Sequence, residues 1–443
     1  MSLRRFPLLP LALGLLALLP QVLAAQAAPA PPDTGRVTAI RAGRLIDTET
    51  GKVASGQMIL VRGGKIVDVG PDVDVPPGAR TIDLADHAVL PGLFDAHAHM
   101  LLTTKRERDN NNYYITTLLE PTAYRAVQGV GNALAMLRAG FTTIRDIGNA
   151  GLYGDVALKQ GIEEGWVEGP TMLVSGVIIA PFGGQFHVQP EKPELAEPEY
   201  LFADSRDEIV AAVRRNAHFG ADFIKIVTDD QRYIYSVDDI KLFIEEAGRM
   251  GMKVAAHCWD IGAHNAALAG VASIEHGLYM PDSTLQVMKK NNVYLVGTDF
   301  TELASREMGR DLFTPAVDRL RRAYRIGVPI AFGTDVVFSL QGEDRGTLTI
   351  DFVSSFERAG IPPNDILKMM TGNAARLLGV DKERGFLRAG MAADIIAVPG
   401  DPLADIDALR EVDFVMKNGR VVRHDAGEED EPLLGSRAAS TAR

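Results

Sequence analysis

The middle of the chain, from about residue 90 to about residue 380, alternates two hydrophobic patterns. Short apolar stretches bounded by Gly, Pro or charged residues indicate buried strands, and the longer segments between them repeat apolar residues at helical spacing. About eight such strand–helix pairs favour an α/β fold with a closed, TIM-like (β/α)8 barrel over an open doubly wound sheet. The predicted strands are Val89–His99, Thr142–Asp146, Thr171–Ser175, Asp222–Val227, Lys253–His257, Ala272–Glu275, Val293–Gly297 and Pro329–Gly333. The predicted helices include Ala123–Arg138, Arg206–His218, Val237–Met250, Pro315–Arg325 and Asn364–Leu378.

Shorter alternating strands flank this region on both sides. Residues 37–90 contain strand patterns separated by turns such as Arg62-Gly63-Gly64, and residues 388–423 contain a second set that includes the turn Asn418-Gly419. Neither block is long enough to bury a comfortable core alone. We therefore predict that the two blocks pair into one small β-sandwich domain, which leaves residues 91–387 for the barrel.

The two ends of the chain have patterns of their own. Arg4 and Arg5 precede an apolar run over Leu8–Leu19 that is too short to span a bilayer well, and small residues follow it. This pattern predicts a signal peptide at residues 1–27 and a Pro/Ala-rich linker at residues 28–36. The protein is then expected to be exported, periplasmic or secreted from a bacterium, and free of the membrane after cleavage. The acidic, then Ser/Ala-rich residues 424–443 predict a disordered tail.

Composition narrows the range of binding partners to be expected. The chain has 443 residues and a formal net charge of −12, with no long cluster of Lys and Arg. Nucleic acid and anionic membranes are therefore not expected as partners, because both require a basic face. Cys258 is the only cysteine, which excludes an intrachain disulfide.

Candidate catalytic residues fall where predicted strands end, which is where barrel enzymes place their functional side chains. His97 and His99 are two residues apart in one strand, so both imidazoles can point to the same side. Lys225 interrupts an apolar strand. Three later strands lead to the remaining candidates, which are His257, His276 and Asp335.

These residue types are suited to a metal centre. Imidazole and carboxylate ligands without a thiolate suit Zn²⁺ or another borderline divalent ion. A protonated lysine cannot be a ligand, but a carboxylated Lys225, formed with CO₂, would be an anion able to bridge two ions. Two divalent metal ions can lower the pKa of a bridging water and polarise a substrate carbonyl. Asp335 would orient that water, take its proton and pass it to the departing amine.

The segments around these residues resemble the amidohydrolase superfamily, in its two-metal subtype with a carboxylated barrel lysine. The resemblance covers nearly the whole chain after the linker, and within the superfamily the chain looks most like the Xaa-Pro and Xaa-Arg dipeptidases and ochratoxinase. It implies carboxypeptidase-like or dipeptidase-like cleavage of the amide bond of dipeptides or N-acyl amino acids, with ochratoxin A among the candidate substrates. The resembling segments are Leu90-Pro91-Gly92-Leu93-Phe94-Asp95-Ala96-His97-Ala98-His99, Ile274-Glu275-His276-Gly277, Phe332-Gly333-Thr334-Asp335, Thr371-Gly372-Asn373-Ala374-Ala375 and Gly390-Met391-Ala392-Ala393-Asp394.

The resemblance also implies a role for each candidate and a homo-oligomeric assembly. It implies two metal sites bridged by Lys225, and it places His187 where relatives have a histidine that polarises the substrate. Two tyrosines after the fourth strand are candidates for binding the substrate carboxylate. Cys258-Trp259-Asp260 departs from the family pattern and leaves the pocket preference open. The implied ligands are His97, His99 and Asp335 for the first metal and His257 and His276 for the second, and the two tyrosines are Tyr233 and Tyr235.

Other functions share parts of this pattern. A metal-dependent deaminase normally uses one metal, needs no barrel lysine and requires an acid, for which Asp260 is the candidate, so Lys225 counts against it. A cyclic-amide hydrolase of the imidazolonepropionase or hydantoinase type remains open, although export counts against it. A non-catalytic scaffold is disfavoured because all six ligand positions are filled. A serine hydrolase is disfavoured because no Gly-x-Ser-x-Gly motif occurs.

Overall fold

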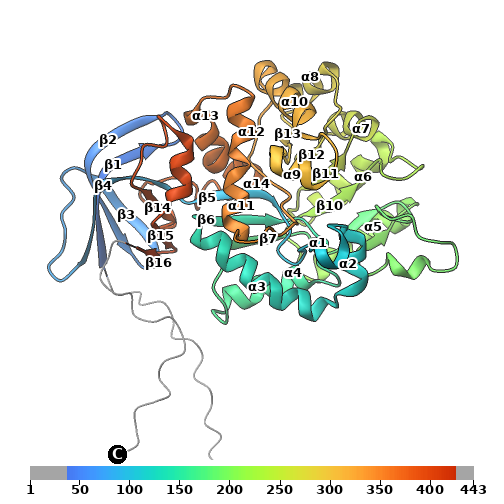
Figure 1. Ribbon diagram of the computed structural model, residues 1–443, viewed down its shortest axis with the longest axis horizontal. Coiled ribbons are helices and arrows are strands. Elements are labelled where there is room, and N and C mark those ends of the chain that lie inside the picture. Colours follow the sequence, from blue (N-terminus) through green and yellow to red (C-terminus); the bar gives the residue numbers. More distant parts are fainter. Residues whose placement is uncertain (1–36, 426–443) are drawn as a thin grey trace, which may run out of the picture.

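The computed structural model describes residues 37–425. Figure 1 shows two parts, with a unit of long strands on one side and a larger body of strands and helices on the other. The predicted signal peptide and linker, and residues 426–443 of the predicted tail, lie outside the described residues. Over the described range, no helix combines the length and the apolar character needed to cross a bilayer.

One seven-stranded sheet joins the two ends of the described chain, in the order β16-β15-β14-β4-β1-β2-β3. A single hydrogen-bonded ladder runs through both of the blocks that were predicted to pair. The reason is that β4 pairs with β1 in parallel on one side and with β14 in antiparallel on the other. The strands are β1 (Val37–Asp47), β2 (Lys52–Arg62), β3 (Lys65–Gly70), β4 (Arg80–Pro91), β14 (Ile395–Val398), β15 (Phe414–Lys417) and β16 (Arg420–His424).

Strand β14 attaches this sheet to the larger body. Ile395 and Ala397 belong to a small core shared with β1 to β4 and β15, whereas Ile396 and Val398 belong to the main core of the protein. Neighbouring side chains of a strand point to opposite faces. A strand that is buried on both faces requires a continuous apolar run, which explains the sequence of β14.

Parallel strands form the centre of the larger body. They make a three-stranded sheet in the order β5-β6-β7 and a six-stranded sheet in the order β13-β12-β11-β10-β8-β9. Every pairing within these two sheets is parallel. The strands are β5 (Leu93–Ala98), β6 (Phe141–Asp146), β7 (Thr171–Val174), β8 (Ile178–Ala180), β9 (Tyr200–Phe202), β10 (Ile224–Val227), β11 (Val254–Cys258), β12 (Ser273–His276) and β13 (Tyr294–Val296).

Backbone hydrogen bonds connect these two sheets to one another at both sides. One bond links β7 to the start of β10, a second links β13 to residues 329–335, and a third links that segment back to β5. Residues 329–335 therefore bond to both neighbours like a strand, although they form no regular strand. The carboxyl ends of the parallel strands meet at one edge, which is where the candidate residues lie. The bonds are Asp222 N to Val174 O, Leu295 N to Pro329 O and Asp335 N to His97 O, each 2.8 Å long.

Helices surround the parallel strands (Figure 1). α5 has the bounds predicted from its amphipathic pattern, and capping boxes at Ser205 and Ser236 begin α5 and α6. The helices are α1 (Arg106–Asp109), α2 (Tyr113–Leu119), α3 (Thr122–Arg138), α4 (Gly154–Glu163), α5 (Arg206–His218), α6 (Val237–Gly248), α7 (Ile261–Ala269), α8 (Asp282–Lys290), α9 (Glu302–Glu307), α10 (Phe313–Ile326), α11 (Arg345–Asp351), α12 (Val353–Arg358), α13 (Pro363–Lys368) and α14 (Ala374–Leu378).

Several predicted boundaries differ from the structure by a few residues, and three differences alter an element. The predicted strand Val89–His99 is divided at Gly92, where a Cβ atom would overlap the side chain of Thr142. The predicted closing helix is interrupted by a π-helical turn, Met369–Asn373, between α13 and α14. The predicted tail begins too early, because His424 still pairs with Phe414 in the sheet.

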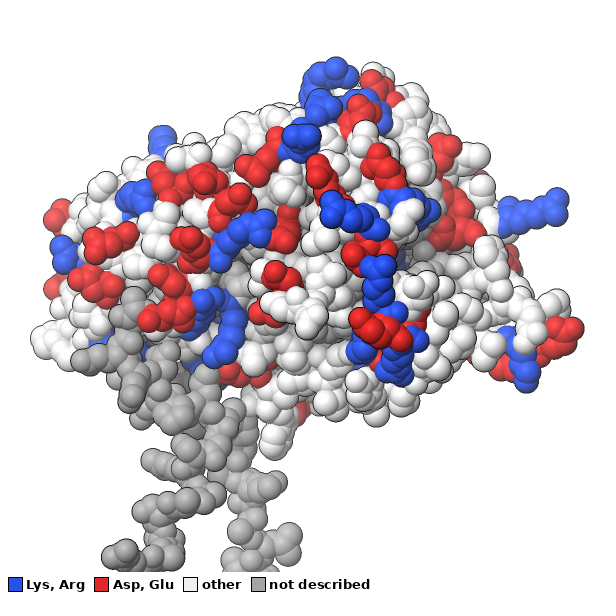
Figure 2. Space-filling model, viewed as in Figure 1, with Lys and Arg blue, Asp and Glu red and all other residues white. Residues whose placement is uncertain are grey.

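Acidic and basic side chains are interspersed over the face of the molecule that Figure 2 presents. Binding to a polyanion requires Lys and Arg side chains gathered along one face or stripe. That face carries no continuous basic area, in keeping with the net charge of −12.

Candidate metal centre and active site

The carboxyl ends of the parallel strands surround one cavity of about 380 Å³. Strand β5 and its end supply two histidines, β10 supplies the lysine, and β11 and β12 each supply one histidine. The aspartate follows the segment that links β13 back to β5. All six predicted ligands line this cavity, namely His97, His99, Lys225, His257, His276 and Asp335.

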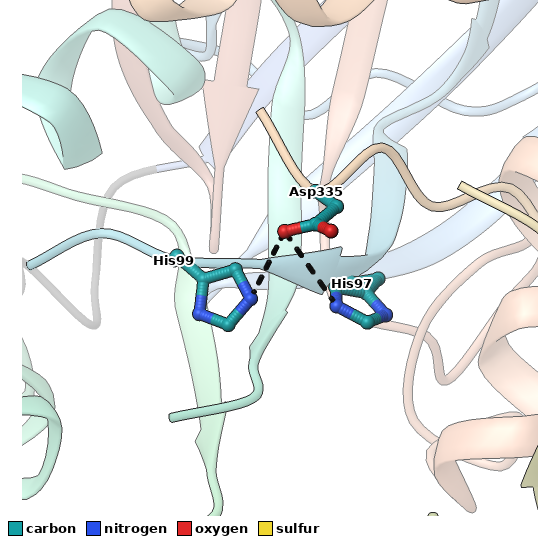
Figure 3. A group of neighbouring side chains, drawn as sticks. All are labelled: His97, His99 and Asp335. Carbon is teal, nitrogen blue, oxygen red and sulfur yellow. Dashed lines mark ion pairs between the residues drawn. The ribbon is translucent and has the colours of Figure 1, made fainter. Parts of the chain in front are cut away.

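His97, His99 and Asp335 form the tightest group in the cavity (Figure 3). One ligand atom from each lies within 4.8 Å of the other two. Oδ1 of Asp335 is 3.2 Å from Nε2 of His99 and 3.9 Å from Nε2 of His97. Three potential ligand atoms thus converge on a space the size of a metal ion.

The remaining two histidines lie beside this group. The ring centroids of His97 and His276 are 4.9 Å apart, and those of His276 and His257 are 4.4 Å apart. Nδ1 of His276 is 3.8 Å from Oδ2 of Asp335. The two predicted metal sites therefore share one continuous cluster.

Each of the four imidazoles has one ring nitrogen held by another group. The other nitrogen of each ring is left to bind a metal, which is the arrangement found around metal-ligating histidines. In His97 and His99 that second nitrogen is the Nε2 that faces Asp335, and in His99 it is hydrogen-bonded to this carboxylate. The restraining contacts are His97 Nδ1 to Glu275 Oε2 at 2.7 Å, His99 Nδ1 to Gly148 O at 2.7 Å, His257 Nε2 to Asp230 Oδ2 at 3.0 Å and His276 Nδ1 to Thr298 Oγ1 at 2.7 Å.

The protonation states of His97 and Asp335 suit a metal. Burial and the nearby Lys225 cation lower the pKa of His97 to about 4, so its ring is neutral near pH 7. Burial would raise the pKa of Asp335, but the hydrogen bond from His99 and the neighbouring His97 outweigh it and lower that pKa. Neutral imidazoles and an ionised carboxylate are the forms that ligate divalent ions. Burial would lower the pKa of His99, but the Asp335 carboxylate outweighs it and raises that pKa, so an ion bound at Nε2 of His99 would replace a proton. With that replacement, the imidazoles and the carboxylate fit a divalent ion.

Lys225 lies in the middle of β10 and is 2% exposed. Burial lowers the pKa of its amine to about 8, while the carboxylates of Glu275 and Asp335 act in the opposite direction. A buried lysine is normally unfavourable unless it has a partner or a function. Its position on the cavity wall points to a function.

The backbone is strained at two of the ligands. His276 has φ of 65° and Asp335 has φ of 59°, in the left-handed region that residues other than glycine seldom adopt. Thr298, which holds the ring of His276, has φ of 50° and is β-branched. Strain of this kind persists where the surrounding structure imposes it, and it is concentrated at functional sites.

Sequence reasoning missed a buried ion pair that supports His97. Glu275 is fully buried, accepts a hydrogen bond from His97 through Oε2 and pairs through Oε1 with Nη2 of Arg145 at 2.7 Å. Arg145 also donates from Nε to Ala96 O at 2.6 Å, beside His97. Charged residues inside the buried strands β6 and β12 were the available signal. The pair fixes the orientation of a predicted ligand from behind.

Replacing Glu275 with alanine is expected to destabilise the fold by about 3–5 kcal/mol, because the buried Arg145 guanidinium loses its counter-charge. Urea unfolding in the presence of a chelator, followed by circular dichroism, measures this without a metal contribution. The matched control is Glu245→Ala, because Glu245 is an exposed residue of α6 whose carboxylate lies 2.7 Å from the Arg249 guanidinium. Its replacement should lower the free energy of unfolding by less than about 1 kcal/mol. Equal losses in the two variants would contradict the role assigned to the buried pair.

A second supporting group, also missed from the sequence, is Asp230, which contacts His257. Burial would raise the pKa of Asp230, but His257, Gln185 and Trp259 outweigh it and lower that pKa to about 2. Asp230 accepts from Nε2 of Gln185 and Nε1 of Trp259, each at 2.6 Å. Trp259 also stacks on the ring of His276, with centroids 5.4 Å apart. Trp259, which is part of the segment that departs from the family pattern, thus forms part of the cavity wall.

The structure brings His187 to the cavity but not the two tyrosines. His187 is exposed and lines the cavity. Tyr235 is fully buried and donates its hydroxyl to Ala203 O at 2.8 Å. The hydroxyl of Tyr233 is bonded to Asp239 at the start of α6, 3.0 Å away. Neither hydroxyl is available to a substrate carboxylate in this conformation.

Residues 88–422 match the amidohydrolase family, and the chain belongs to that family. The resemblance noted in the sequence is therefore confirmed, and the protein is a hydrolytic enzyme of a metal-dependent family. The chain is 28% identical over 436 residues to ochratoxinase of Aspergillus niger, which covers 88% of each chain. It is 24% identical over 407 residues to imidazolonepropionase of Kosmotoga olearia, which covers 84% of this chain and 92% of the relative.

A solved structure of a Xaa-Pro dipeptidase, with methionine bound in its active site, is similar to this one with a TM-score of 0.76 and 28% sequence identity. The match covers 87% of this chain and 100% of the dipeptidase chain. These likenesses imply a TIM-like barrel with an additional domain.

Proposed function

We propose that the protein hydrolyses the amide bond of dipeptides or N-acyl amino acids, including aryl amides such as ochratoxin A. The observation that carries this proposal is the placement of Lys225 in the same cavity as four histidines and Asp335. The similarity to ochratoxinase and to a Xaa-Pro dipeptidase supports this substrate class. Water is added across the C–N bond, which yields a carboxylic acid and a free amine.

Two divalent ions, with Zn²⁺ the first candidate, would be held by the six cavity residues. When bound, they would supply Lewis acidity to the substrate carbonyl and lower the pKa of a bound water. His97, His99 and Asp335 would hold one ion and His257 and His276 the other. Lys225, carboxylated by CO₂, would contact both.

Two side chains of the cavity have roles beyond metal binding. Asp335 is ionised and partly exposed to the cavity, so it can accept the proton of the attacking water and deliver it to the departing amine. His187 lines the same cavity and can donate a hydrogen bond to the substrate carbonyl oxygen. Glu275, outside the cavity, positions His97, and Asp230, which is part of the cavity wall, positions His257.

Fold and cellular context complete the proposal. We infer that the connected parallel strands and their helices are a (β/α)8 barrel, with the seven-stranded sheet as its additional domain. The N-terminal pattern supports export to the periplasm or secretion. The family resemblance supports a homo-oligomer.

Hydrolysis of a cyclic amide is the second candidate, because the chain is also similar to imidazolonepropionase. Such a reaction would use the same cluster on a ring amide. A deaminase receives less support, because Asp260, its candidate acid, is exposed and is not among the residues that line the cavity.

A substrate panel with metal-loaded enzyme separates these candidates. Dipeptides, N-acyl amino acids and ochratoxin A are compared with imidazolonepropionate and a hydantoin, and product release is followed by liquid chromatography. We expect turnover of linear amides only, lost on chelation and restored by Zn²⁺. Turnover restricted to the cyclic amides would favour the second candidate and contradict the first.

A further inference from the structure

A substrate with a free carboxylate requires a cation or several donors to bind it. Because Tyr233 and Tyr235 point elsewhere, the donor must come from another element. Among the described residues that line the cavity, the only Lys and Arg are Lys225 and Arg310. Lys225 belongs to the ligand cluster, so Arg310 is the cation that remains for an anionic substrate group.

Arg310 lies in the connection between β13 and α10. Four residues of this connection line the cavity, namely Phe300, Glu307, Met308 and Arg310. The connection therefore forms one wall of the site, beside the catalytic cluster rather than within it.

The backbone of Arg310 is held in place while its side chain is exposed. The hydroxyl of Ser305 donates to Arg310 O at 2.9 Å and accepts from Leu312 N at 2.7 Å. Gly309, with φ of +69°, turns the chain immediately before Arg310. Ser305 is 5% exposed, so this anchor is internal to the wall.

The charge of Arg310 is not neutralised by its surroundings. Glu307, the acid on the same wall, is engaged by Arg106 of α1 at 2.7 Å. Within residues 37–425, no carboxylate lies within 4.0 Å of the Arg310 guanidinium. An arginine without an ion-pair partner, on a wall that also presents Phe300 and Met308 to the cavity, is suited to an anionic ligand.

We propose that Arg310 binds the α-carboxylate of the amino acid released by the reaction, and so selects substrates with a free carboxyl terminus. This inference rests on the proposed amide hydrolysis. A guanidinium matches a carboxylate through two parallel hydrogen bonds, which fixes the orientation of the bound amino acid as well as its charge. The scissile amide, one Cα away from that carboxylate, is then directed toward the cluster around Asp335.

The test compares Arg310→Met with the wild-type enzyme on paired substrates. One substrate is the best dipeptide of the panel, and the other is its C-terminal carboxamide, which lacks the negative charge. We expect Arg310→Met to raise KM for the free acid by about 10- to 100-fold, the range of a charge-assisted hydrogen bond, with kcat changed by less than about threefold. The variant and the wild type should act on the carboxamide equally.

Two further variants isolate the guanidinium. Arg310→Lys keeps the charge, so its KM for the free acid should lie between those of the wild type and Arg310→Met. Arg306→Met, the matched control, removes an exposed arginine of α9 that does not line the cavity and should leave KM unchanged. An unchanged KM in Arg310→Met, or an equal rise for acid and carboxamide, overturns the role of Arg310 alone. A wild-type enzyme inactive on every acylated amino acid overturns the proposed function as well.

Discussion

Lys225→Ala is expected to lose metal and more than about 100-fold of the amidohydrolase activity. Removing a residue that only orients a metal ligand typically lowers metal affinity or activity by about 10- to 100-fold. Removing a ligand that bridges two ions should lower them further. Lys225 is buried in β10 on the wall of the cavity that the histidines share. Metal content by plasma mass spectrometry and kcat/KM on the best panel substrate are the two measurements.

The Lys225→Ala variant also tests carboxylation. A short carboxylic acid such as formate or propionate can occupy the space of the missing side chain and supply the two oxygens of a carbamate, so we expect partial recovery of metal and activity. Lys241→Ala, an exposed lysine of α6, is the matched control and should behave as the wild type. Unchanged metal content in Lys225→Ala would refute the bridging role.

Asp335→Asn is expected to lower kcat by about 10²- to 10⁴-fold, the range for a general acid–base residue. An amide cannot accept the proton of the attacking water, and it is also a poorer metal ligand than a carboxylate. The contact of Asp335 with Nε2 of His99, 3.2 Å long, can be made by an amide as well, so the fold should be retained. Steady-state kinetics with metal-saturated enzyme measure the loss.

Asp260→Asn is the control for Asp335→Asn and separates two reactions. Asp260 is exposed, and its side chain makes no capping bond at the start of α7. Amide hydrolysis as proposed does not use it, so the variant should retain wild-type kcat. A large loss in Asp260→Asn, with little loss in Asp335→Asn, would contradict the assignment of the proton acceptor.

The predicted ligands came from local sequence because their positions follow from short-range geometry. His97 and His99 alternate along one strand, and the apolar runs before His257 and His276 mark strands whose ends share one edge. The helix Arg206–His218 was likewise predicted with its observed bounds from periodicity.

The supporting groups could not be predicted in this way. Arg145 and Glu275 are separated by 130 positions, and only the packing of β6, β12 and the strands between them brings the two charges together. A charged residue in an apolar strand indicates that a partner exists, but not which one. The pairing is decided by the cost of burying either charge alone.

The course of the cavity wall also depended on tertiary structure. Tyr233 and Tyr235 follow the strand of Lys225 closely, yet their hydroxyls are bonded to Asp239 and Ala203 on the outer side. Arg310, far from any predicted strand end, lines the cavity instead. The direction in which a loop side chain points is set by contacts with distant segments. The periodicity of the sequence contains no information about those contacts.

The chain's own order of residues was thus sufficient for the family, for the alternation of strands and helices and for the candidate ligands that share one cavity, because repeating patterns of burial impose these features locally. Tertiary structure decided how both ends share one sheet, which buried charges are paired and which side chains face the substrate. Those features depend on the free energy of contacts between segments that are distant in sequence. The same local pattern is compatible with several different sets of such contacts.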